Sequence, residues 1–83
     1  MPSALSDPSY RAFAQHLVEL RRRTGLTQRD LALRLGRPQS FVNKAELCER
    51  RLDPAEFRAI VQALGFDPAA EFAAVCKALT ATR

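Results

Sequence analysis

The sequence predicts a small all-α protein, a compact five-helix bundle. Its 83 residues are rich in Ala, Leu, Arg and Glu, which favour helices, and they include only three glycines. Apolar residues recur at helical spacing, and the alternation typical of strands is absent. Asp-Pro pairs at residues 7–8, 53–54 and 67–68 combine a strong N-cap with a proline suited to the first helical position. Each pair therefore predicts the start of a helix.

Two helices are expected in the first part of the chain. The first runs from about residue 8 to residue 23 and ends near Gly25. The second begins after Thr27 as its N-cap and ends before Gly36, a candidate left-handed cap. Their inward-facing residues are Tyr10, Phe13, Leu17, Leu20, Leu31, Ala32 and Leu35.

Three more helices follow. The third is expected from Pro38 or Gln39 to Leu47, the fourth over residues 54–64 and the fifth over residues 68–79. The fourth begins with Asp53 and, three residues later, Glu56, a spacing that resembles a capping box. The inward-facing residues are Val42, Ala45, Phe57, Ile60, Val61, Leu64, Phe72, Val75, Cys76 and Leu79.

We expect a single domain over residues 1–83, with a core at residues 8–79 and frayed ends at 1–6 and 80–83. No apolar run approaches the roughly 20 residues that span a bilayer, and no signal peptide is recognised. Cys48 and Cys76 lack metal-ligand spacing and are expected to be reduced thiols. The expected compartment is the cytoplasm of a bacterial or phage-carrying cell, with neither metal nor cofactor.

Positive charge is concentrated in the middle of the chain. Residues 21–51 hold nine Lys or Arg and three Asp or Glu, a net charge of +6, whereas residues 1–20 and 52–83 each carry −1. A polyanionic partner such as DNA explains this concentration. A solvated basic face that aids solubility is the alternative.

Residues 27–44 have the pattern of a helix, a sharp turn and a second helix. The first turn of the second helix offers Gln39 and Ser40, with Asn43 and Lys44 one turn later. A reader of the DNA major groove needs polar side chains at this place. The pattern predicts a small DNA-binding regulator in which these four residues contact bases. Solvated surface positions are the alternative, and Lys44 could contact phosphate instead.

Several motifs together carry a family resemblance. They are Leu20-Arg21, Gly25-Leu26-Thr27-Gln28, Leu31-Ala32, Leu35-Gly36, Gln39-Ser40-Phe41-Val42, Lys44, Glu46, Arg50-Arg51-Leu52-Asp53 and Ala63-Leu64-Gly65. As a set they resemble the Xre/Cro family of phage and bacterial repressors, over roughly residues 13–68. The resemblance implies a lambda-repressor-like DNA-binding domain without enzymatic activity, which typically binds operator DNA as a dimer.

The resemblance also implies roles for residues around the two reading helices. Gln28 would donate to a DNA phosphate and support the reading helix, although a capping role alone is the alternative. Thr27 would cap the second helix while the backbone amides there face phosphate. Arg21 and Glu46 would form a buried or half-buried ion pair between the first helix and the end of the third.

Further DNA contacts are expected on either side of the reading helix. Arg37 is assigned to phosphate. Phe41 is placed in the same set, with a position beside a thymine methyl or packing on the protein as alternatives. Arg50 and Arg51 could form a phosphate clamp, a solvated loop or dimer contacts. The predicted phosphate-contacting set is Thr27, Gln28, Arg37, Phe41, Arg50 and Arg51.

Two positions depart from the family pattern. The family usually has glycine in a Glu-x-Gly sequence at the end of its third helix, where this chain has Glu46-Leu47-Cys48. If the backbone there is left-handed, cysteine costs about 1 kcal/mol relative to glycine. An inert side chain and a thiol switch are both open for Cys48. Ala45 replaces a larger residue, which would leave space or let the helix pack closer.

The fifth helix carries an apolar stripe that could form the interface of a two-fold dimer. Packing against the first helix of the same chain is the alternative. The stripe consists of Phe72, Val75, Cys76 and Leu79.

An enzyme is not expected from this sequence. His16 is the only histidine and belongs to no catalytic motif. The sequence has neither a Gly-rich phosphate loop nor a metal-ligand cluster. We predict instead a sequence-specific transcriptional regulator, a repressor or a dual repressor and activator, that binds a palindromic operator as a homodimer. A protein-interaction module such as an antitoxin or adaptor is the main alternative, and a non-specific DNA binder is another.

Overall fold

The computed structural model describes residues 7–81, a range that contains five helices and no strand. The helices are α1 (Pro8–Thr24), α2 (Gln28–Leu35), α3 (Gln39–Glu46), α4 (Pro54–Ala63) and α5 (Pro68–Ala81). The predicted all-α fold class is confirmed. α5 continues to Ala81, past the predicted end at residue 79, so residues 80 and 81 are helical rather than frayed. The ends predicted to fray at residues 1–6 and 82–83 lie outside the described residues.

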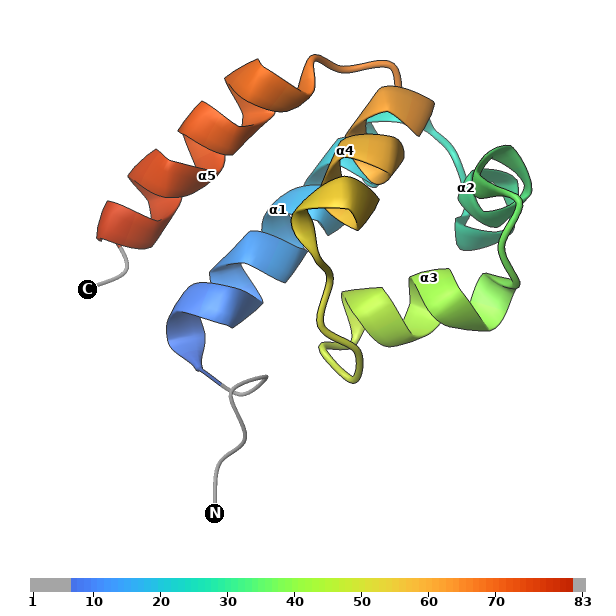
Figure 1. Ribbon diagram of the computed structural model, residues 1–83, viewed down its shortest axis with the longest axis horizontal. Helices are drawn as coiled ribbons and strands as arrows, with labels where there is room; N and C mark the ends of the chain where they lie inside the picture. The colour runs from blue at the N-terminus through green and yellow to red at the C-terminus, as the bar shows by residue number, and fades with distance from the viewer. Residues whose placement is uncertain (1–6, 82–83) are drawn as a thin grey trace.

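α1 and α4 form the middle of the bundle, with α2 and α3 on one side and α5 alongside α1 on the other (Figure 1). α1 contacts both α3 and α5, and α4 contacts both α2 and α5. Leu20, Val61 and Val75, from three different helices, are the largest side chains that are fully buried. All five helices contribute residues to the core, and α3 contributes only its inner face, so the outer face of α3 stays open to solvent.

Side-chain caps hold the helix starts where the Asp-Pro pairs predict them. At α4 the predicted capping box is present: Glu56 N donates to Asp53 Oδ1 (2.7 Å), and Asp53 N donates to Glu56 Oε1 (3.0 Å). At α5, Ala70 N donates to Asp67 Oδ2 (3.2 Å). These bonds satisfy amide groups that have no partner inside the helix, so they fix where each helix begins.

The apolar residues of α4 face the bundle, where Phe57, Ile60 and Val61 are all buried. Within residues 7–81, no single helix is long and apolar enough to cross a membrane. α4 and α5 meet that criterion only when taken together, as a pair bent by 115°.

Candidate nucleic-acid interface

The two faces of α3 have different chemistry. Phe41, Val42 and Ala45 are buried and attach the helix to the core. The other face presents four polar side chains, all exposed: Gln39, Ser40, Asn43 and Lys44. Positions three and four residues apart share a helix face, so these donors and acceptors form one surface. They are the four residues that the sequence predicts to contact bases.

The carboxyl end of α3 is held by a half-buried ion pair. Arg21 Nε donates to Glu46 Oε2 (2.6 Å) and Arg21 Nη2 to Glu46 Oε1 (3.0 Å), with side-chain exposures of 13% and 12%. Arg21 Nη1 also donates to the carbonyl of Leu26 (2.8 Å). The hydrogen bonds that Arg21 donates to Glu46 raise the pKa of Arg21. The family-based expectation of a pair between these residues therefore has its counterpart in the structure.

Gln28 adds a third donor to the same carboxylate. Its Nε2 donates to Glu46 Oε1 (2.8 Å), so Gln28 connects the start of α2 to the end of α3. This contact is the support of the reading helix that the resemblance implies. A phosphate contact by Gln28 stays a prediction.

Thr27 lies exposed at the start of α2, in a capping box with Asp30. Asp30 N donates to Thr27 Oγ1 (3.0 Å), and Thr27 N donates to Asp30 Oδ2 (3.0 Å). These hydrogen bonds lower the pKa of Asp30. The sequence analysis assigned the cap to Thr27 but not its partner Asp30, although acid three residues after threonine is a capping-box spacing. A phosphate at this helix end would meet the carboxylate of Asp30 as well as the amides.

Arg37 and Arg50 lie on either side of α3 in sequence and come together in space. Their guanidinium carbons lie 3.9 Å and 4.7 Å from the ring centroid of Phe41. Phe41 is only 7% exposed and belongs to the core, so its assignment to the phosphate-contacting set is wrong. The ring is covered because it anchors α3. Its position agrees with the alternative expectation that Phe41 packs on the protein.

The loop after α3 also depends on Tyr10 of α1. The Tyr10 hydroxyl accepts from Leu52 N (2.9 Å) and donates to the carbonyl of Arg50 (3.3 Å). The guanidinium carbon of Arg51, an exposed residue, lies 5.2 Å from the centroid of the Tyr10 ring. Sequence reasoning placed Tyr10 only in the apolar stripe, since no local pattern links residues 40 positions apart.

The chain matches a family model described as "Helix-turn-helix domain" over residues 12–81. It is also similar to a solved structure, an XRE-family like protein from Pseudomonas syringae pv. tomato str. DC3000. The two chains are 46% identical, with a TM-score of 0.80 over 83% of this chain and 84% of that one. This chain belongs to the Xre family of helix-turn-helix proteins. No curated protein matches it.

As an Xre-type protein, the chain is in general terms a DNA-binding regulator.

The turn after α3 has Cys48 where the family usually has glycine. Cys48 adopts φ 61°, the left-handed region that favours glycine. Cys48 N donates to Ala45 O (3.3 Å), and Glu49 N donates to Lys44 O (2.8 Å). These are the paired hydrogen bonds of a Schellman turn. Gly36 ends α2 with φ 67°, so Cys48 has the backbone conformation that glycine has at the end of α2.

The fifth helix of this Xre-type protein packs on its own chain. Val75 is 1% exposed and belongs to the core, so its assignment to a dimer interface is wrong. His16 Nε2 lies 2.9 Å from Glu71 Oε1 and links α1 to α5, a partner that the sequence analysis missed. Phe72 is 55% exposed, Cys76 is exposed and Leu79 is partly buried, so these three members of the stripe stay available to a second molecule.

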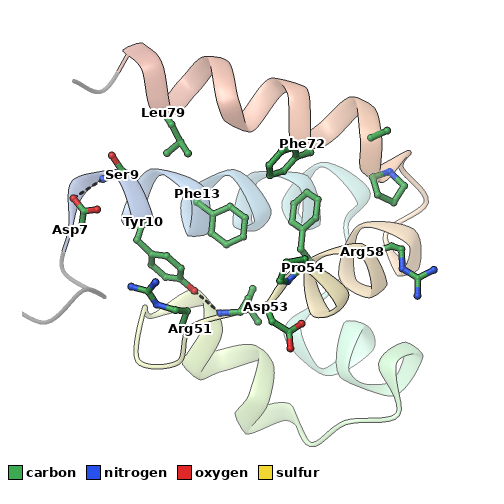
Figure 2. Close-up of a pocket in the computed structure, with 14 residues that line it drawn as sticks. Asp7, Ser9, Tyr10, Phe13, Arg51, Asp53, Pro54, Arg58, Phe72 and Leu79 are labelled. Carbon is green, nitrogen blue, oxygen red and sulfur yellow. Dashed lines mark hydrogen bonds between the residues drawn. The ribbon is translucent and has the colours of Figure 1, made fainter.

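An apolar groove of about 650 Å³ lies between α1, α4 and α5 (Figure 2). Phe72 and Leu79 reach it from α5, and Tyr10 and Phe13 from α1. Four aromatic rings follow one another along it, with centroid distances of 5.4, 5.7 and 5.9 Å in the order Tyr10, Phe13, Phe57 and Phe72. Its rim carries charges of both signs, including Asp53 and Arg58.

In residues 7–81, no three His, Cys, Asp or Glu side chains lie close enough together to hold a metal ion. Cys48 and Cys76 are free thiols. The exposed polar side chains of α3 offer hydrogen-bond donors, acceptors and positive charge, which suit recognition of DNA bases and phosphates.

Proposed function

We propose that this Xre-type protein is a non-enzymatic transcriptional regulator that binds a palindromic operator in double-stranded DNA as a homodimer. In this proposal α3 enters the major groove, and Gln39, Ser40, Asn43 and Lys44 contact base edges. The observation that supports it is the exposed polar face of α3, which is held rigidly from behind by the core and by the Arg21–Glu46 pair. Rigid support matters because a bidentate contact to a base needs its donors in fixed places.

Charge supports the same proposal. The net +6 of residues 21–51 includes Arg37, Arg50 and Arg51, all of which lie near the ends of α3. Arginine matches the geometry of a phosphate through two parallel donors. We assign Thr27, Gln28 and these three arginines to phosphate, with the protein acting in the cytoplasm where bacterial or phage DNA lies.

The dimer is proposed from the α5 side. A phenylalanine that is 55% exposed beside an apolar groove is a surface that a second copy of the chain would cover. Two α3 helices related by a two-fold axis would then read half-sites about one helical turn apart. Repression is the expected outcome at an operator that overlaps a promoter, and activation at one that lies upstream.

Selection of bound sequences from random duplex DNA, followed by a salt titration of the selected duplex, tests DNA recognition. We expect an enriched inverted repeat whose affinity falls steeply as salt rises. If no sequence is enriched but affinity still falls with salt, the protein is a non-specific binder. If no DNA binds, the alternative of an antitoxin or adaptor gains support.

Sedimentation of matched variants tests the dimer. Phe72→Ser removes an exposed apolar side chain from the groove, whereas Leu33→Ser removes one that is 74% exposed on α2. We expect only Phe72→Ser to shift the protein towards monomer. Equal behaviour of the two variants would refute the α5 interface.

A further inference from the structure

A single carboxylate gathers two arginines from opposite ends of the reading helix. Glu56 accepts bidentate hydrogen bonds from Arg50, with Nη1 to Oε1 at 3.0 Å and Nη2 to Oε2 at 2.9 Å. Arg37 Nη1 lies 3.8 Å from the same Oε2. Arg37 precedes α3 and Arg50 follows it. Glu56 also completes the cap of α4, so its own position is fixed by the backbone of Asp53.

The ring of Phe41 is a flat support beneath both guanidinium groups. A guanidinium group stacked on the ring is attracted by the negative charge of the ring face, which favours this position. The Arg37 and Arg50 side chains nevertheless stay 42% and 38% exposed. Arg50 uses three of its five N–H groups on Glu56 and on the carbonyl of Arg51, which leaves two for another acceptor. The two arginines are thus oriented and still have donors for a ligand.

Tyr10 holds the backbone of the same loop. Its hydroxyl accepts from the amide of Leu52 (Figure 2) and donates to the carbonyl of Arg50, while the guanidinium carbon of Arg51 lies 5.2 Å from the centroid of its ring. Burial raises the pKa of this hydroxyl, so it remains a protonated donor at neutral pH. The loop is therefore attached to α1 as well as to α4.

We infer that Glu56 and Tyr10 are positioning residues that hold Arg37, Arg50 and Arg51 as a preformed clamp for DNA phosphate beside α3. The inference rests on the proposed DNA-binding function and assigns roles to two residues outside the reading helix. Preorganisation matters because a long side chain that becomes ordered only on binding weakens the complex. The clamp would fix the register of α3 on the duplex without reading bases itself.

Charge and positioning predict opposite effects, and Glu56→Gln separates them. The change adds one positive unit, so electrostatics alone would tighten binding to DNA. Glutamine still offers an oxygen to cap α4 but cannot accept two bonds from Arg50. Glu49→Gln is the matched control, because Glu49 is exposed in the loop that carries Arg50 and the change adds the same charge. Tyr10→Phe is the second variant, since it keeps the ring and removes only the bridging hydroxyl.

The measurement is the Kd of each variant for the duplex selected by the wild-type protein, as a function of salt and with folding verified by circular dichroism. Relative to Glu49→Gln, we expect Glu56→Gln to bind about two- to twelvefold more weakly, the range for one side chain that loses its order. Relative to the wild type, we expect Tyr10→Phe to weaken binding within the same range. The slope of log Kd against log salt should fall by about one for each DNA phosphate that a variant no longer binds.

Binding by Glu56→Gln as tight as that by Glu49→Gln, with the same salt slope, would overturn the clamp and leave Glu56 as a helix cap. Unchanged binding by Tyr10→Phe would show that the Tyr10 hydroxyl does not contribute to the clamp. Failure of the wild-type protein to select any duplex would instead contradict the proposed function, so the two failures are distinguishable.

Discussion

Two arginine–glutamate ion pairs beside α3 have the same chemistry in different surroundings. At the carboxyl end, Glu46 binds Arg21, and both side chains are nearly covered, with exposures of 12% and 13%. In the loop that follows α3, Arg50 pairs with Glu56 of α4, and its side chain is 38% exposed. The covered pair is closed to a ligand and acts on the fold, whereas the guanidinium group of Arg50 keeps donors at the surface. Burial, not the type of contact, separates the two pairs.

The largest expected effect comes from breaking the covered pair. Glu46→Gln leaves Arg21 half-buried without its counter-charge and weakens the contact to Gln28. We expect the free energy of unfolding to fall by about 3 kcal/mol, the lower end for a buried pair that loses one partner, which lowers the Tm by about 12–24 °C. Thermal and urea unfolding followed by circular dichroism measure this. A Tm loss no larger than that of Glu56→Gln would contradict the distinction between the two ion pairs.

Substitutions on the exposed polar face of α3 should affect DNA binding and not folding. Gln39→Ala and Lys44→Ala each remove an exposed side chain from α3. We expect each to weaken binding to the selected duplex by about 1–3 kcal/mol if the residue contacts a base, with an unchanged Tm. Competition against duplexes mutated one base pair at a time measures the loss of specificity. An equal loss of affinity for all duplexes would indicate that the residue contacts phosphate and not a base.

The two turns that flank α3 allow a third comparison, since Gly36 and Cys48 have nearly equal φ angles of 67° and 61°. Cys48→Gly should stabilise the fold by about 1 kcal/mol, because glycine adopts this conformation without strain. Cys48→Ala should not, as it removes the thiol but keeps the side-chain strain. Gly36→Ala should destabilise by a similar amount, although a Cβ there would meet nothing within 4 Å. Equal unfolding free energies for the glycine and alanine variants of Cys48 would show that the turn is unstrained.

The smallest expected effect is a dependence of stability on pH at the exposed pair. Hydrogen bonds from Arg50 lower the pKa of Glu56 below its ordinary value of 4.5. Since the folded pKa is the lower one, the contribution of Glu56 to stability is fully present above the unfolded pKa and is lost as pH falls through the folded pKa. Between pH 7 and pH 3, the Tm of Glu56→Gln should therefore fall less than that of the wild type. Parallel Tm profiles would contradict the bond to Arg50 in solution.

Much of the fold could be predicted because its cues are local. Asp53 and Glu56 cap α4 three residues apart, and the exposed residues of α3 follow helical spacing. The Arg21–Glu46 pair came from the family resemblance, not from local pattern. The errors arose where one residue type fits two surroundings: Phe41 and Val75 are apolar and lie on helices near predicted interfaces, yet both are buried in the core.

By itself, the sequence determined the five helices, their starts and the polar face of α3, because capping and helical periodicity depend on residues within a few positions of each other. Only the tertiary structure decided that Glu56 meets Arg37 and Arg50 over the ring of Phe41, and that Tyr10 reaches the loop after α3. Those contacts join segments far apart in the chain, and their geometry depends on how α1, α3 and α4 pack around one core. The burial that distinguishes Arg21, at 13% exposure, from Arg50, at 38%, is likewise a property of that packing.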